Sequence, residues 1–546
     1  MKIFSISFVM ALVIVLIPTI SNGQYVSGKF IPDRTKDLGK DMSDWSYKLS
    51  TTINTADLKK HIFTLASDEF QGRETGAPGN DKAAEYISNV FAKLHLPEVG
   101  PDGAYSQKVA FSFISWAALK LSMNGNSYRN LRDFIAFPQF SKDQKIKKGE
   151  VVFIGYGIDD EAYSDYNGVN VKDKIVVAYD REPINIEGNS LISNDVQYSE
   201  WSDDWHLKSK AAQKHGAKAL MIVSNDIKGL INKNRRSLVN KITLLGKHSA
   251  PEDEANTLFI SPELAKSILG DKVESIIAMR DKLRTSQKTM EAVILDTKIN
   301  LDQKVENEVL LGQNLLGFIE GSDLKDELVI VSAHYDHVGI KGAEVYNGAD
   351  DNASGTSTVL EIAEALQLGK LMKNGPRRSV LCLMMTGEEK GLLGSEYYVE
   401  NPVYPIENTI ADVNIDMVGR WGEEYQGTTE PYNYVIGSDR LSMDLHNINE
   451  AMNQKYSQML MDYKYNDEAD PNRFYFRSDH YNFAKKGIPA IFFFNGVHED
   501  YHRLTDTPDK IDLSLMETRG RQIFHTVWEL ANRDQRIQLN STLNGQ

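Results

Sequence analysis

Short apolar runs alternate with longer segments of mixed character in the carboxyl-terminal half of the chain. The runs typical of buried strands lie at 328–333, 379–386, 410–415 and 488–494. Apolar residues recur at helical spacing in the segments 354–366, 441–455 and 513–533. Strands that alternate with helices favour an α/β fold. We therefore predict a three-layer α/β domain with a mostly parallel central sheet for residues 299–546.

The amino-terminal half has a different pattern. Apolar residues at helical spacing within 58–65 and 83–94 flank a loop rich in glycine and proline. The next part contains short strand-like runs at 151–154, 174–179 and 219–223. One helical segment lies at 205–215, before the last of these runs. We predict that residues 24–118 are the first part of the α/β domain. Residues 119–298 are then an inserted β-rich domain that carries none of the candidate chemistry.

The composition excludes some classes of function, and the amino-terminal residues indicate where the protein is located. A net charge of −15 and a pI near 5.4 argue against a nucleic-acid-binding surface. The single cysteine, Cys382, excludes an intramolecular disulfide and a thiolate zinc site. Residues 1–23 contain an early lysine, an apolar core and small residues at the end, which is typical of a cleavable secretory signal. The alternative is a membrane anchor. We expect an exported protein, periplasmic or extracellular, without a stable membrane anchor after cleavage.

Candidate chemistry begins where the first apolar run of the α/β domain ends. His334 and Asp336 are two residues apart, so in a strand their side chains project to the same side. This spacing suits an imidazole that binds a metal and is held by a carboxylate. For an isolated His-x-Asp pair, a simple turn-capping role is the favoured explanation. The acidic pair Asp350 and Asp351 follows, just before a helical pattern.

Each later apolar run is also followed by acidic or imidazole groups. Glu388 and Glu389 follow the second run, Asp416 ends the third, and Tyr501 and His502 come after the fourth. Any one of these groups is compatible with an ordinary charged surface. Because ligand groups in open α/β sheets collect at the carboxyl ends of strands, the set together indicates one metal-dependent active site.

Several of these segments match a known family in order. They are SAHYDHVG, GADDNASG, TGEEKGLLGS, NIDMVG, SDHYNFAKKGIPAIF and DYHRLTDT, between residues 314 and 507, preceded by DEFQGRETGAPGNDKAAEYI. The chain resembles the co-catalytic zinc aminopeptidases of the secreted bacterial type, which are relatives of glutamate carboxypeptidase, transferrin receptor and glutaminyl cyclase. The segments VVFIGYG, VKDKIVV and KHGAKALMIV make the insert similar to a protease-associated domain.

The resemblance implies a role for each candidate residue. It makes His334 and Asp416 ligands of one zinc ion, Glu389 and His502 ligands of a second, and Asp351 the bridge between them. It makes Glu388 the general base, Asp336 the support of His334, and Tyr501 a donor to the developing oxyanion. It also implies a cis peptide bond between Asp351 and Asn352. Two Zn²⁺ ions per chain are expected, with Co²⁺ or Mn²⁺ as possible substitutes. Asp350 is an alternative to Asp351, and His498 an alternative to His502.

The implied function is a secreted aminopeptidase that hydrolyses peptide substrates. Three alternatives stay open: a glutaminyl cyclase-like transferase with one zinc, a carboxypeptidase for acidic peptides, and a receptor-like binding module without activity. Two further predictions concern neighbouring residues. Arg73 and Glu74 are expected in a solvated turn, and His480 is expected to pack without a catalytic role.

Overall fold

The chain divides into two compact units. A computed structural model describes residues 44–247, 250–286 and 288–541. The first unit contains the described residues up to Val109 together with those from Gly312 onward, and the second is Ala110–Leu311. The second unit contains the predicted insert, 119–298, and is longer at both ends. Strands β1 (Ser106–Met123) and β9 (Val293–Ile319), which were not predicted, each cross a boundary between the units.

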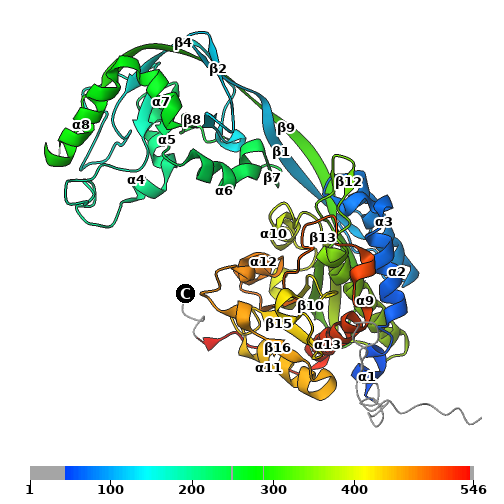
Figure 1. The fold of residues 1–546 in the computed structure, drawn as a ribbon. Coiled ribbons are helices and arrows are strands. Elements are labelled where there is room, and N and C mark those ends of the chain that lie inside the picture. Colours follow the sequence, from blue (N-terminus) through cyan, green and yellow to red (C-terminus); the bar gives the residue numbers. More distant parts are fainter. Residues whose placement is uncertain (1–43, 248–249, 287, 542–546) are drawn as a thin grey trace, which may run out of the picture. The chain divides into compact units, whose positions relative to one another are not determined.

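The first unit is built on a mostly parallel sheet (Figure 1). Its strands besides β9 are β10 (Leu324–His334), β13 (Arg378–Met385), β14 (Thr409–Ile415), β15 (Tyr432–Ile436), β16 (Leu460–Asp462) and β17 (Ala490–Phe494). Their order is β16-β15-β17-β14-β10-β13-β9. Strands β13, β10, β14 and β17 run parallel, whereas β9 and β15 each pair antiparallel with their inner neighbours. The predicted fold class is therefore confirmed. A separate two-stranded ribbon joins β11 (Ile340–Lys341) to β12 (Glu344–Val345).

Helices cover both faces of this sheet. They are α1 (Trp45–Ser50), α2 (Thr55–Leu65), α3 (Pro78–Lys93), α9 (Gly355–Leu371), α10 (Leu393–Glu400), α11 (Met443–Met452), α12 (His480–Lys485) and α13 (Leu513–Asn532). Alternate residues of β10 face opposite sides: Val329 and Val331 belong to the core shared with α2, α3, α9 and α13. Leu328 and Ile330 pack instead with side chains of α10 and α12. This alternation produces the three layers.

All four predicted strands of the α/β domain are present, since each run is apolar enough to be buried on both faces of the sheet. They correspond to β10, β13, β14 and β17. The predicted helices correspond to α9, α11 and α13. The prediction omitted β15 and β16, because β15 contains the polar Asn433 and β16 has only three residues.

The second unit contains helices as well as the strands expected of the insert. Besides β1 and β9 its strands are β2 (Asn126–Tyr128), β3 (Phe134–Ile135), β4 (Gln144–Phe153), β5 (Ile175–Tyr179), β6 (Ala219–Val223), β7 (Asn240–Leu244) and β8 (Asn256–Ile260). Its helices are α4 (Glu200–Asp203), α5 (Trp205–Lys214), α6 (Ile227–Val239), α7 (Pro262–Leu269) and α8 (Val273–Ser286). Strands β4, β5, β6 and β8 are parallel neighbours, which is typical of strands joined through helices. The similarity to a protease-associated domain stays a prediction.

The expected secretory signal, residues 1–23, lies outside the described residues. Among the helices that the structure does describe, none combines the length and the apolar character needed to cross a membrane.

Candidate metal centre

The strand ends bring a first group of ligand atoms together. His334 is the last residue of β10, Asp416 directly follows β14, and Asp351 precedes α9. The imidazole Nε2 of His334 lies 3.2 Å from Asp416 Oδ1 and 3.4 Å from Asp351 Oδ1. All three residues are buried, at 8% exposure or less. Their donor atoms are close enough to hold one ion.

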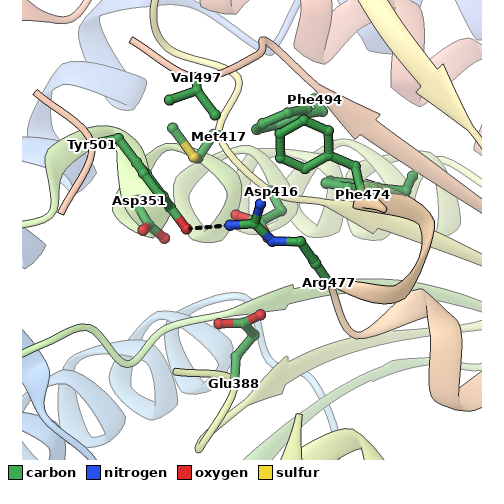
Figure 2. A pocket seen from close by; sticks show the side chains of 10 residues that line it. Asp351, Glu388, Asp416, Met417, Phe474, Arg477, Phe494, Val497 and Tyr501 are labelled. Atoms are coloured by element: carbon green, nitrogen blue, oxygen red, sulfur yellow. Dashed lines mark hydrogen bonds between the residues drawn. The ribbon is translucent and has the colours of Figure 1, made fainter. Parts of the chain in front are cut away.

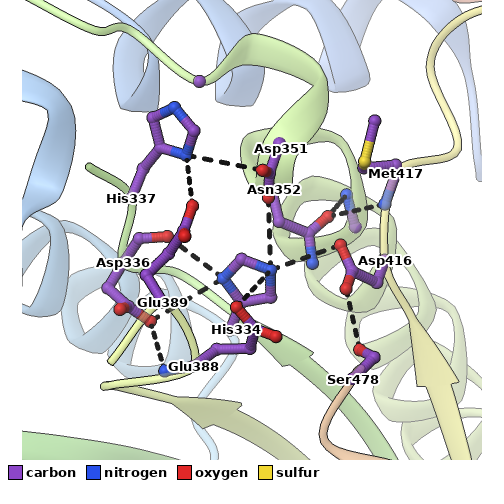
Figure 3. A network of polar contacts seen from close by, with 12 residues as sticks. His334, Asp336, His337, Asp351, Asn352, Glu388, Glu389, Asp416, Met417 and Ser478 are labelled. Carbon is purple, nitrogen blue, oxygen red and sulfur yellow. Dashed lines mark hydrogen bonds and ion pairs between the residues drawn. The ribbon is translucent and has the colours of Figure 1, made fainter. Parts of the chain in front are cut away.

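A second group lies on the other side of Asp351. His502 Nε2 is 2.9 Å from Asp351 Oδ2 and 3.0 Å from Glu389 Oε1. His337 joins this group, with Nδ1 3.0 Å from Glu389 Oε1 (Figure 3). The two carboxylate oxygens of Asp351 therefore face different groups, as a bridging ligand requires.

The structure thus brings all five predicted ligands into one place: His334, Asp351, Glu389, Asp416 and His502. The donor set also fits metal ions, because Glu389 Oε1 is buried beside two imidazoles and makes no hydrogen bond. Imidazole and carboxylate groups without thiolates suit zinc. Their roles as ligands stay predictions.

Backbone geometry before α9 positions Asp351. The Asp351–Asn352 peptide bond is cis, as the family resemblance implies. The Asn352 side chain donates to the carbonyl of Ile415 at 3.0 Å and accepts from the amide of Met417 at 3.1 Å. The carboxylate of Asp506 accepts the Asp351 amide at 3.1 Å. The two hydrogen bonds of Asn352 connect the segment that contains Asp351 to the end of β14, next to Asp416.

The two alternative ligands pair with each other. Asp350 Oδ2 lies 3.0 Å from His498 Nε2, and Asp350 Oδ1 accepts the amide of Gly419 at 2.7 Å. Both side chains are buried and belong to neither ligand group in the described part of the chain. This arrangement favours Asp351 and His502 as the ligands.

Asp336 supports the site in a different way from the expected one. Its Oδ1 is 3.7 Å from His334 Nδ1, whereas its own backbone carbonyl lies 3.1 Å from that nitrogen. The carboxylate accepts the amide of Glu388 at 3.2 Å and the hydroxyl of Thr75 at 2.8 Å. Asp336 therefore positions the backbone of Glu388 as well as the imidazole.

Sequence reasoning did not find the residues that orient Asp416. The hydroxyl of Ser478 donates to Asp416 Oδ2 at 2.7 Å, and Asn414 donates to that hydroxyl at 2.8 Å (Figure 3). Such partners fix the orientation of a ligand. Ser478 lies in the quoted segment SDHYNF, but a serine next to acidic residues gives no signal of this role.

A pocket opens beside the ligand groups (Figure 2). Asp351, Glu388 and Asp416 line one side of it. The other lining residues are mostly apolar, namely Met417, Phe474, Phe492, Phe494 and Val497, together with Arg477 and Tyr501. The guanidinium of Arg477 donates to the Tyr501 hydroxyl at 3.4 Å. Carboxylates, a phenol and apolar side chains thus line the same pocket.

The pKa of Glu388 is shifted by its surroundings. Burial raises the pKa of the Glu388 carboxyl well above its usual range. The carboxylates of Glu389 and Asp416 raise this pKa further, and His334 opposes them. Burial by itself would lower the pKa of His502, but Asp351 and Glu389 raise it to about 10. Of the carboxyl groups of Asp351, Glu388 and Glu389, only that of Glu388 has a pKa above its usual range.

His480 behaves as expected. It is fully buried, and its ring stacks on Phe492 with the centroids 4.9 Å apart. Burial lowers its pKa to about 3, so the imidazole is neutral. It packs beneath the pocket and contributes no atom to the ligand groups of the described residues.

The expected solvated turn at Arg73 is wrong. Arg73 is fully buried, and its guanidinium donates to four backbone carbonyls at 2.6–2.8 Å, those of Leu65, Tyr335, Asn347 and Gly348. Burial lowers its pKa to about 10, against the opposing carboxylates of the site. Arg73 connects the segment after β10 to the loop that carries Asp351. Glu74 is half-buried and pairs with Lys390 at 2.6 Å.

We expect Arg73→Met to destabilise the first unit strongly. The change leaves buried carbonyl oxygens without donors, and hydrogen bonds to charged groups contribute about 1.5–3 kcal/mol each. The free energy of unfolding, measured in urea, should fall by at least about 3 kcal/mol. The matched change Lys60→Met, at an exposed position of α2, should stay within about 0.5 kcal/mol. Equal stability of the two variants would contradict a structural role for Arg73.

Comparison with known proteins agrees with this geometry. Residues 314–527 match the model of peptidase family M28. This part of the chain is therefore similar to peptidase family M28. The matched segment contains every predicted ligand, and both ligand groups lie within it.

Similar proteins include several aminopeptidases. The chain is 29% identical over 213 residues to a probable leucine aminopeptidase of Trichophyton verrucosum, covering 38% of this chain and 55% of that protein. Aminopeptidase YwaD of Bacillus subtilis is 26% identical over 347 residues, 61% of each chain. The matches thus span between half and two thirds of these relatives. The solved aminopeptidase from Aneurinibacillus sp. strain AM-1 shares the fold, with a TM-score of 0.52 at 19% identity over 90% of this chain and 97% of that one.

Proposed function

We propose that this chain is a zinc-dependent aminopeptidase that binds two ions and removes amino-terminal residues from peptides. The observation that carries the proposal is the position of Asp351. One of its carboxylate oxygens faces His334 and the other faces His502, so a single residue can serve two ions. The aminopeptidases among its relatives support the reaction class.

Two bound zinc ions would polarise a peptide carbonyl and lower the pKa of a water molecule. His334 and Asp416 would hold one ion, His502 and Glu389 the other, and Asp351 both. The remaining task for the chain is proton transfer and charge stabilisation. The Glu388 carboxylate, 4.0 Å from His334 Nε2, is placed to take a proton from the attacking water and to deliver it to the leaving amine.

Tyr501 is placed to stabilise negative charge on the carbonyl oxygen of the substrate. It lines the pocket, and its ring stacks on His502 with the centroids 4.0 Å apart. Burial, followed by the nearby carboxylates of Asp351 and Glu389, raises the pKa of its hydroxyl. A phenol that keeps its proton can donate a hydrogen bond to an oxyanion.

The pocket favours substrates with a free amino terminus and an apolar first residue. Of the carboxylates that line it, that of Glu388 belongs to neither ligand group and can attract an ammonium group. The phenylalanines opposite offer apolar surface for a side chain. A carboxypeptidase is the second candidate, because Arg477 lies in the same pocket and can pair with a carboxylate of the substrate.

A panel of small substrates tests this proposal. We expect leucyl and phenylalanyl anilides to be hydrolysed, and their amino-acetylated forms to be hydrolysed at least about 100-fold more slowly, because a buried polar or charged group left unpaired costs several kcal/mol. Activity should be lost with a strong chelator and should return with zinc. Preferred cleavage of amino-blocked peptides at the carboxyl end would instead support the carboxypeptidase. Elemental analysis that returns a single ion would favour the cyclase-like transferase.

A further inference from the structure

His337 is an unassigned residue in the second ligand group. It lies three residues after His334, beyond the end of β10, and is fully buried. Its Nδ1 is 3.0 Å from Glu389 Oε1 and 3.7 Å from Asp351 Oδ2. Figure 3 shows its ring turned toward these two carboxylates. The predicted ligand set does not include this imidazole.

The ring does not have the surroundings of a hydrogen-bonding histidine. Neither of its nitrogens makes a hydrogen bond, although both are buried. Glu389 Oε1, the oxygen that faces Nδ1, also lacks a hydrogen bond. Buried polar atoms without hydrogen-bond partners are rare in folded proteins, and several at one place suggest an ion that satisfies them. Their separations match ligand atoms that share one ion.

The backbone holds His337 in this position. Its amide donates to the carbonyl of Arg73 at 3.3 Å. The loop before Asp351 passes directly over the ring at Gly348, where a Cβ would lie 2.4 Å from His337 Cδ2. Gly348 also has φ of +57°, a conformation that favours glycine. The close approach confines the imidazole and leaves Nδ1 facing the ligand group.

We propose that His337 is a fourth protein ligand, through Nδ1, of the ion that Asp351, Glu389 and His502 bind. This inference rests on the proposed two-ion function. The two sites then differ: one has four protein donors, and the site of His334, Asp351 and Asp416 has three. Closed sites with four protein ligands hold zinc tightly, whereas sites with three keep a position open. The ion beside His337 should therefore be retained longest, and the open position should lie on the side of His334.

The first test measures ion affinity. Purified chain carrying two zinc ions is dialysed against chelators of increasing strength, and zinc content is determined by mass spectrometry. In the wild type, we expect one ion to leave before the other. In His337→Ala, the retained ion should bind at least about 100-fold more weakly, because even the loss of an outer partner costs about 10–100-fold. The control His334→Ala should weaken the other ion instead.

The outcomes separate this inference from the proposed function. Unchanged affinity for both ions in a folded His337→Ala variant overturns the role of His337 and leaves the two-ion proposal standing. A wild-type chain that binds no zinc defeats both. Circular dichroism spectra that match those of the wild type establish that each variant is folded.

A second variant gives a spectroscopic readout. Cysteine at 337 presents a thiolate toward the same ion, and a zinc–sulfur bond of about 2.3 Å, longer than a zinc–nitrogen bond of about 2.0–2.1 Å, makes up part of the difference in side-chain length. His337→Cys loaded with Co²⁺ should show a thiolate-to-cobalt charge-transfer band that the wild type lacks. Burial raises the pKa of Cys382 and keeps that thiol protonated, so it is silent in both proteins. Absence of the band in a cobalt-loaded variant would overturn the proposal.

Discussion

Replacing Glu388 by glutamine should reduce turnover by about 10²–10⁴-fold while the ion content stays unchanged. The substitution keeps the size and polarity of the side chain but removes the carboxylate oxygen that accepts the proton. Glu388 lies beside the ligand groups and belongs to neither of them within the described residues. The loss should therefore appear in kcat, measured with leucyl anilide, and zinc should not restore it.

Glu389→Gln is the matched control, because it makes the same change one residue away. Glu389 Oε1 lies within 3.0 Å of two imidazole nitrogens, so its loss should weaken one ion. Excess zinc should then restore part of the activity. The reverse pattern, in which zinc restores Glu388→Gln and a fully loaded Glu389→Gln is inactive, would show that the two roles have been exchanged.

The positions of the site residues along the chain could be predicted because they follow buried strands. The apolar runs that became β10, β13, β14 and β17 are local patterns, and each is followed by candidate chemistry. In a sheet whose central strands are parallel, the carboxyl ends of these strands must lie at the same edge of the sheet. The clustering of His334, Glu389 and Asp416 could thus be predicted from local sequence patterns and one rule of sheet topology.

Residues placed by distant contacts could not be predicted in this way. Arg73 lies in a loop rich in glycine, where a charged side chain is usually solvated. The carbonyls that surround it belong mainly to residues about 260–275 positions later, and no local pattern shows their approach. His337 is a similar case, because its direction depends on the loop at Gly348. The motif SAHYDHVG does contain a second histidine, and this was the one available signal.

The choice between neighbouring acids also depended on tertiary structure. Asp350 and Asp351 are adjacent, chemically identical and both buried. The structure distinguishes them by their partners, since Asp350 pairs with His498 and Asp351 faces His334 and His502. A count from the following helix favours Asp351, but only the partners give a physical reason for that choice.

Asp351→Asn should remove both ions and almost all activity. A neutral amide cannot serve as an anionic bridge, and its two ends differ, so at most one of them can face an ion as an acceptor. Losing metal-based stabilisation of about 4 kcal/mol or more corresponds to a rate loss of about a thousandfold or greater. Zinc content, measured after gel filtration, should fall from about two ions per chain toward none.

Two controls make this expectation specific to the bridging position. Asp416→Asn removes a ligand of one group only, so one ion should remain. Asp350→Asn makes the identical change at the adjacent residue, whose carboxylate contacts His498 and the amide of Gly419. That variant should lose stability but keep both ions. If Asp350→Asn loses both ions and Asp351→Asn retains them, the bridging role belongs to Asp350. An ion held in Asp351→Asn as tightly as in the wild type would mean that its site does not depend on a shared carboxylate.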